Sequence, residues 1–78
     1  MEYCYKKMGK LILQLRRKRG YSQEVLSGLA GIGRSHLAMI EAGKKNASVE
    51  TLCRIAEALD LSMSGLFQMY ESEPKKNT

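Results

Sequence analysis

The chain carries apolar residues at repeated spacings of three and four, the spacing of one face of an α-helix. The segments expected to be helical are residues 5–19, 22–30, 34–41, 48–59 and 63–70. Their predicted core-facing residues are Met8, Leu11, Ile12, Leu15, Val25, Leu26, Leu29, Ala30, Leu37, Ile40, Val49, Leu52, Ile55, Ala56 and Leu59. Because no segment reads as a strand, we predict an all-α fold of five helices.

Residues that favour helix ends lie where this pattern begins and stops. A serine hydroxyl can accept a hydrogen bond from the unpaired amides of a helix start, and glycine can adopt the left-handed geometry that ends a helix. The predicted N-caps are Ser22, Ser48 and Ser62, and the predicted stops are Gly20, Gly31 and Gly43. Gly9 lies inside residues 5–19, where it lowers helix propensity by about 1 kcal/mol, so we expect another backbone to pack closely there.

Two of these helices are separated only by a short glycine turn. Residues 22–30 are followed by Gly31-Ile32-Gly33, in which Gly33 is the predicted N-cap of residues 34–41. Leu37 and Ile40 are expected to be buried, which turns Arg34 outward. A short helix with a basic N-terminus, held across a supporting helix by such a turn, is typical of a helix-turn-helix unit, whose second helix fits the major groove of DNA.

The charge balance agrees with a polyanionic partner. The chain has 78 residues, with 13 Lys and Arg against 8 Asp and Glu, a net charge of +5 and a pI of about 9.4. This length predicts one small domain, residues 1–70, followed by a polar tail of residues 71–78 that contains Pro74.

Several other functions lack the residues they need. Cys4, Cys53 and the single His36 do not form a metal-binding pattern, and we expect two reduced thiols. No apolar run is long enough to span a bilayer, and residues 1–10 lack the apolar core of a signal peptide, so we expect a cytoplasmic protein without membrane contact. We predict no catalytic residues, no metal, no cofactor and no small-molecule ligand.

The fifth predicted helix is apolar over more of its circumference than one core-facing stripe requires. In so small a domain, this surplus favours a partner surface, and we predict self-association through this helix. The residues assigned to the dimer interface are Leu66, Phe67, Met69 and Tyr70.

Taken together, these motifs make the chain resemble the phage repressor and Cro type of helix-turn-helix domain, which also occurs in controller proteins of restriction-modification systems. The resemblance covers Met8 to Phe67. Its carrying residues are G-K-L-I-L-Q-L-R in the first helix, Ser22-Gln23-Glu24, the Gly31 turn, Ile40-Glu41-Ala42-Gly43, and S-V-E-T-L-C-R-I-A-E-A-L from Ser48.

The resemblance implies a role for individual residues. Base-reading positions are Arg34, Ser35, Ala38 and Met39. Phosphate-binding positions are Gln23, His36, Lys44, Lys45 and Asn46; for Gln23 and the 44–46 loop, the start of a helix and a polar loop beside the reading helix agree with this role. Arg16 and Glu41 match a family ion pair that fixes the third helix against the first. Ser27 stands where the family most often has Ala, so its buried hydroxyl must find a hydrogen bond.

The function implied is that of a sequence-specific transcriptional regulator that binds double-stranded DNA as a homodimer on a near-palindromic operator. Autoregulation of its own promoter is an expectation from the family alone. The alternative is a protein-binding module of the antitoxin or antirepressor type, which would capture a partner through the apolar fifth helix. Cations gathered around the third helix favour DNA, because a pure protein binder has no need for them.

Overall fold

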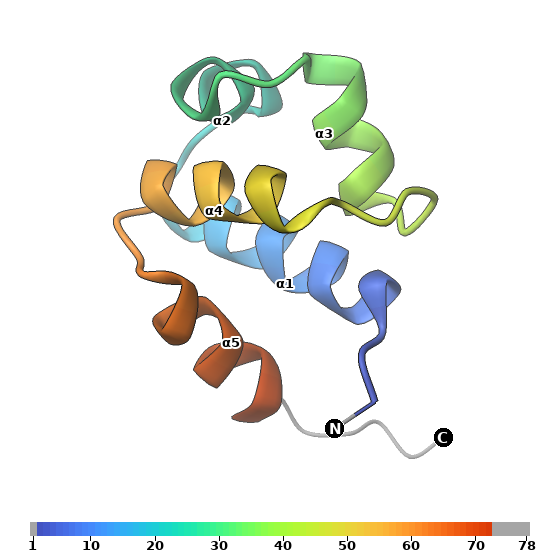
Figure 1. The fold of residues 1–78 in the computed structure, drawn as a ribbon. Helices are drawn as coiled ribbons and strands as arrows, with labels where there is room; N and C mark the ends of the chain where they lie inside the picture. Colours follow the sequence, from blue (N-terminus) through green and yellow to red (C-terminus); the bar gives the residue numbers. More distant parts are fainter. Residues whose placement is uncertain (1, 73–78) are drawn as a thin grey trace.

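The computed structural model describes residues 2–72, which form five α-helices and, within this range, no strand. The helices are α1 (Tyr5–Lys18), α2 (Gln23–Ala30), α3 (Arg34–Glu41), α4 (Val49–Ala58) and α5 (Met63–Ser72). Figure 1 shows α2 and α3 together at one end of the molecule, α5 at the opposite end, and α1 and α4 between them. The predicted all-α fold of five helices is therefore confirmed.

The first four helices end in the same hydrogen-bonded motif. At the end of α2, the amide of Gly31 donates to the carbonyl of Gly28 and the amide of Ile32 donates to that of Ser27. This pair of bonds is a Schellman motif, which requires a positive φ at the stop residue, and φ is +69° at Gly31. The equivalent stop residues are Gly20, Gly43 and Asp60. The predicted glycine stops are confirmed, and Asp60 (φ +60°) fills the same position without being glycine.

The predicted serine caps are also confirmed. Ser22 accepts a hydrogen bond from the amide of Val25, Ser48 from that of Thr51, and Ser62 from that of Gly65. Each bond satisfies one of the amides that a helix start leaves without an intrahelical partner, which fixes where α2, α4 and α5 begin.

One continuous core lies between the helices. Its largest fully buried side chains are Met8, Ile12, Leu26, Leu37, Ile40, Ile55, Leu59 and Leu66. The side chain of Ser27 is also buried, and its hydroxyl donates to the carbonyl of Glu24 at 3.1 Å, so the bond that this position required is present.

Gly9 marks the closest approach of two helices. A Cβ atom built on Gly9 would lie 2.0 Å from the carbonyl oxygen of Ile40. The backbone of α1 therefore rests directly on the end of α3, as the glycine in the first helix predicted. This contact is possible only without a side chain at residue 9, and it fixes how α3 is held.

Three apolar residues expected in the core lie at the surface instead. Val49 is 70% exposed, Leu29 is 59% exposed, and Val25 is also exposed. Val25 and Leu29 lie on α2, and Val49 lies on α4. Both helices are short, and each buries fewer of its apolar residues than their spacing suggested. On α2 only Leu26, Ser27 and Ala30 are buried.

The boundary predicted at residue 70 also differs from the structure. Helix α5 continues through Ser72, so residues 71 and 72 belong to the helix and not to a tail. The rest of the predicted tail, residues 73–78, lies outside the described residues. No helix within residues 2–72 has the length and apolar content needed to cross a membrane.

Candidate nucleic-acid interface

Helices α2 and α3 pack against each other through the turn at residues 31–33 and present one face of α3 to solvent. Leu37 and Ile40 anchor α3 in the core. The opposite face carries Arg34 and Ser35, which are exposed at the start of the helix, and Met39, which is exposed one turn later. Ala38 is partly buried on the same side. The α3 N-terminus is thus the free end of a helix fixed from behind.

The loop after α3 begins at the C-terminal end of this helix. The amide of Lys44 donates to the carbonyl of Met39 at 2.9 Å, which turns the chain back over the end of the helix. Lys44, Lys45 and Asn46 are all exposed, whereas His36, on α3 itself, is partly buried. The loop therefore adds two solvated cations at the C-terminal end of α3, whereas Arg34 lies at its N-terminal end.

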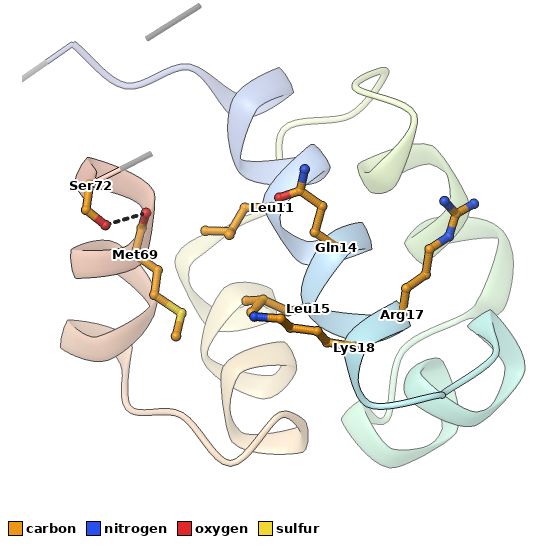
Figure 2. A pocket seen from close by; sticks show the side chains of 7 residues that line it. All are labelled: Leu11, Gln14, Leu15, Arg17, Lys18, Met69 and Ser72. Atoms are coloured by element: carbon orange, nitrogen blue, oxygen red, sulfur yellow. Dashed lines mark hydrogen bonds between the residues drawn. The ribbon is translucent and has the colours of Figure 1, made fainter. Parts of the chain in front are cut away.

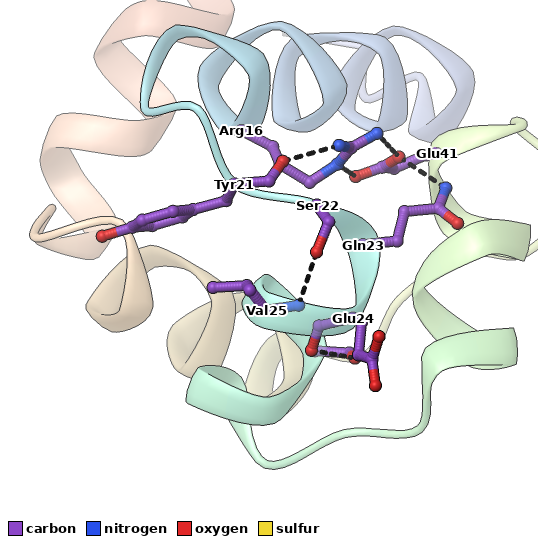
Figure 3. Close-up of polar contacts among 8 residues, drawn as sticks. Arg16, Tyr21, Ser22, Gln23, Glu24, Val25 and Glu41 are labelled. Atoms are coloured by element: carbon purple, nitrogen blue, oxygen red, sulfur yellow. Dashed lines mark hydrogen bonds and ion pairs between the residues drawn. The ribbon is translucent and has the colours of Figure 1, made fainter.

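A cluster of buried polar groups joins the three helices behind this surface (Figure 3). Arg16 on α1 binds both carboxylate oxygens of Glu41 on α3, with its Nε donating to Oε2 at 2.8 Å and its Nη2 donating to Oε1 at 2.9 Å. Its third nitrogen, Nη1, donates to the carbonyl oxygen of Tyr21 at 2.8 Å, just before α2. The ion pair expected between Arg16 and Glu41 is present and bidentate.

Hydrogen bonding in this cluster favours the charged form of Arg16. Hydrogen bonding to Glu41 raises the pKa of Arg16 above its ordinary value and outweighs burial, which acts in the opposite direction. Both side chains are almost fully buried, so removal of either one would leave an unpaired charge away from water. The cluster therefore holds the end of α3 at a fixed position relative to α1 and to the start of α2.

Gln23 has a contact that the sequence did not reveal. Its side-chain amide Nε2 donates to Glu41 Oε1 at 2.9 Å, so this residue joins the ion-pair cluster. We expected the side chain to reach for DNA phosphate. The structure gives it a link from α2 to α3, and the amide of Val25 at the α2 N-terminus donates to the hydroxyl of Ser22. The phosphate contact itself stays a prediction.

The residues assigned to the dimer interface do not share one exposed surface. Leu66 is 0% exposed and Tyr70 is 2% exposed, so both belong to the core, and their assignment to a partner surface is wrong. Phe67 is half-buried and Met69 is 39% exposed. The apolar surplus of α5 exists mainly because this helix closes the core over α1 and α4.

The N-terminal segment covers part of the apolar surface of α5. The sequence did not predict this contact. The amide of Cys4 donates to the hydroxyl of Tyr70 at 2.7 Å. The ring of Tyr3 packs against those of Phe67 and Tyr70, with centroids 6.0 and 5.5 Å away. Nothing in the spacing of these residues signals the contact, because it joins positions more than sixty residues apart.

Comparison with known proteins gives consistent matches. A helix-turn-helix family model matches residues 12–66. The uncharacterised HTH-type transcriptional regulator y4dJ of Sinorhizobium fredii is 35% identical over 57 residues, which cover 73% of this chain and 74% of the relative. The crystal structure of the restriction-modification controller protein C.AhdI from Aeromonas hydrophila aligns with a TM-score of 0.77 and 36% identity over 81% of this chain and 96% of that one.

A third match shows the fold in another setting. The controller protein C.Esp1396I, whose structure was determined as a tetramer in complex with its natural 35 base-pair operator, aligns with a TM-score of 0.83. It is 24% identical to this chain, and the alignment covers 91% of this chain and 93% of that one.

Proposed function

This chain belongs to the Cro/C1-type helix-turn-helix family, and from that premise we propose that it is a sequence-specific DNA-binding transcriptional regulator that acts as a homodimer on a near-palindromic operator. In this proposal the protein binds DNA, catalyses no reaction and acts in the cytoplasm. Its own promoter is the first operator to test.

One observation carries the proposal: α3 is anchored from behind while its N-terminal face is free. Gly9, Arg16 and Glu41 fix the end of α3 against α1, which supports a rigid reading helix. Arg34 and Ser35 then stand at the exposed start of the helix, where side chains of a recognition helix reach base edges in the major groove.

The exposed side chains of α3 suit different parts of a base pair. Arg34 can donate two hydrogen bonds to O6 and N7 of guanine, a pairing worth about 1–3 kcal/mol of discrimination. Ser35 can donate to or accept from a base edge. Ala38 and Met39 can contact the methyl group of thymine. Arg34 is therefore the residue that we expect to contribute most to sequence preference.

The surrounding polar groups suit the sugar-phosphate backbone. Lys44, Lys45 and Asn46 lie on the loop beside α3, and His36 lies on the helix itself. The backbone amides that open α2 at Gln23 offer a further anion site. Contacts of this kind set the position of the protein on DNA and make its affinity depend on salt.

A homodimer would place two copies of α3 in successive major grooves. Such a pair requires half-site centres about 34 Å apart, or roughly 10 base pairs. The tetrameric operator complex of C.Esp1396I supports an oligomeric mode for this fold. Of the residues that we assigned to the interface, Phe67 keeps an exposed part for it, whereas Met69 lies in a groove between α1 and α5.

The test is a fluorescence-anisotropy titration with duplex DNA from the promoter of the protein's own gene, against a shuffled duplex, at two salt concentrations. Arg34→Ala should lower affinity for the promoter duplex by about tenfold or more and move it toward the shuffled level. Lys18→Ala removes the same charge from the α5 side of α1 and is the matched control, which should bind almost as the wild type does.

Equal, weak binding of both duplexes by the wild-type protein at low salt would contradict autoregulation and move the search to other operators. Equal losses in Arg34→Ala and Lys18→Ala would contradict the reading role of Arg34. The homodimer is tested separately by sedimentation equilibrium, where a monomer at high micromolar concentration would refute it.

A further inference from the structure

A groove runs between α1 and α5, on the side of the molecule away from α3. It has a volume of about 680 Å³, and Leu11, Leu15 and Met69 form its apolar lining. A second hollow of about 310 Å³ shares Leu15 and Met69 with it and extends it toward Leu61, beyond the end of α4. The two hollows are therefore parts of one surface feature, the α1–α5 groove.

The lining of the groove is suited to contact with another apolar side chain. Leu11 is buried at its base, Leu15 is half-buried, and Met69 is 39% exposed at its edge. Figure 2 shows Met69 extending from α5 toward Leu15 and Lys18 of α1. Methionine is flexible and polarisable, so it adapts to a ligand of irregular shape better than a branched side chain does.

A cation lies over this apolar lining. Lys18 extends across Leu15 toward Met69, whereas Arg17, which also contributes to the lining, directs its guanidinium away from Met69 (Figure 2). Within residues 2–72, neither side chain forms a salt bridge, whereas the neighbouring Arg19 is paired with Asp60 at 2.9 Å. The nearby Glu71 lies two residues beyond Met69 and so about 200° around α5, on another face. The rim therefore carries uncompensated positive charge.

We propose that the α1–α5 groove binds an acidic amphipathic helix of a protein partner. Apolar side chains of that helix would enter the groove beside Leu15 and Met69, as an amphipathic helix places its apolar face in a hydrophobic groove. Its carboxylates would face Lys18. A second copy of this chain fits less well, because a two-fold interface would bring the same cationic rim together from both sides.

The groove lies away from the proposed DNA-reading face of α3. In Figure 1, α5 lies at the end of the molecule opposite α2 and α3, so a partner in the groove leaves the proposed DNA-reading face uncovered. The partner would therefore join the regulator while it is on DNA. This goes beyond the proposed operator binding and does not depend on it, because the two events use separate surfaces.

The probe is a fluorescein-labelled synthetic helical peptide of about four turns, with leucines along one face and glutamates on the others. A matched peptide carries lysine in place of every glutamate. We expect the glutamate peptide to bind the full-length protein at micromolar concentration, at least tenfold more tightly than the lysine peptide, and to weaken as salt is raised.

Charge reversal locates the site. Lys18→Glu should weaken the glutamate peptide about tenfold and strengthen the lysine peptide, while Met69→Ser should weaken both. Lys44→Glu makes the same charge change on the loop beside α3 and should leave peptide binding unchanged. All three positions are exposed, so circular dichroism of the variants should match the wild type.

Three results would overturn the proposal: equal affinity for both peptides, no effect of Lys18→Glu, or loss of peptide binding in Lys44→Glu. Self-association that is lost in Met69→Ser would also overturn it, since the groove would then belong to a second copy. Titration of Lys18→Glu, Met69→Ser and Lys44→Glu with DNA measures operator binding separately. Failure of the groove proposal and failure of the operator-binding proposal can therefore be told apart.

Discussion

Replacement of Gly9 by Ala tests how α1 fixes α3. The added Cβ would lie 2.0 Å from the carbonyl oxygen of Ile40 and 3.1 Å from its carbonyl carbon. Ordinary contacts of a Cβ begin near 3.4 Å, so α1 and α3 must separate by more than an ångström. Because both sides of the contact are backbone, no change of side-chain rotamer can relieve it.

The expected magnitude follows from two opposing effects. Overpacking of this kind costs about 1–3 kcal/mol, and a backbone contact belongs at the upper end of that range. Alanine improves helix propensity over glycine by up to about 1 kcal/mol. We therefore expect Gly9→Ala to lower the free energy of unfolding by about 2 kcal/mol, a large part of the roughly 4–12 kcal/mol typical of a domain of this size.

The assay is urea denaturation followed by circular dichroism, with Gly28→Ala as the matched control. Gly28 also lies inside a helix, but a Cβ built there meets nothing within 4 Å. This control should gain about 0.5–1 kcal/mol from helix propensity alone. The two variants make the same chemical change, so their difference of roughly 3 kcal/mol isolates the contact with Ile40.

An equal or higher stability of Gly9→Ala relative to the wild type would refute this reasoning. It would mean that α1 and α3 can move apart without loss and that Gly9 does not fix the position of α3. Equal gains in both alanine variants would lead to the same conclusion.

Other contacts give three further predictions, all measured by the same denaturation assay. Glu41→Ala leaves Arg16 buried without its partner and should lower the free energy of unfolding by about 3 kcal/mol or more; a change below about 1 kcal/mol would contradict the buried ion pair. Tyr70→Phe removes the hydroxyl that accepts the Cys4 amide and should cost about 1 kcal/mol, and an unchanged midpoint would show that the N-terminal segment does not contribute. Val49→Thr should change stability by no more than about 0.5 kcal/mol because the side chain is exposed, whereas a loss typical of a core position would contradict its placement.

Helical periodicity predicted the long helices better than the short ones. In α1 the stripe of Met8, Leu11 and Ile12 is buried as expected. On α2, two turns of helix are too few to define a narrow stripe, so Val25 and Leu29 were wrongly assigned to the core. Spacing alone shows which residues share a face but not how much of that face another helix covers.

Helix ends were predictable where the residue at the end is of a type that strongly favours a helix stop or a helix cap. Glycine at a left-handed stop and serine at a cap are such cases, and both were read correctly at Gly31 and Ser48. Asp60 adopts the same left-handed geometry, which aspartate tolerates, but the residue is equally common in ordinary loops. Its role as a helix stop could not be read from its identity.

The candidate site was predictable in part because the local pattern and the resemblance agreed. The outward position of Arg34 follows from the burial of Leu37 and Ile40, and the pair of Arg16 and Glu41 from the family. The bond from Gln23 to Glu41 did not follow from either. It depends on how three helices meet, and a sequence pattern within one helix carries no information about that.

DNA recognition through α3 is tested most directly by selection from a randomised duplex library, run in parallel with the wild-type protein and Arg34→Ala. We predict that the wild type enriches an inverted repeat with half-site centres about 10 base pairs apart. Arg34→Ala should enrich the same repeat with its preference lost at one G·C pair in each half-site. Failure of the wild type to enrich any sequence, or enrichment of an identical motif by both proteins, would contradict the assignment of α3 and Arg34 to base reading.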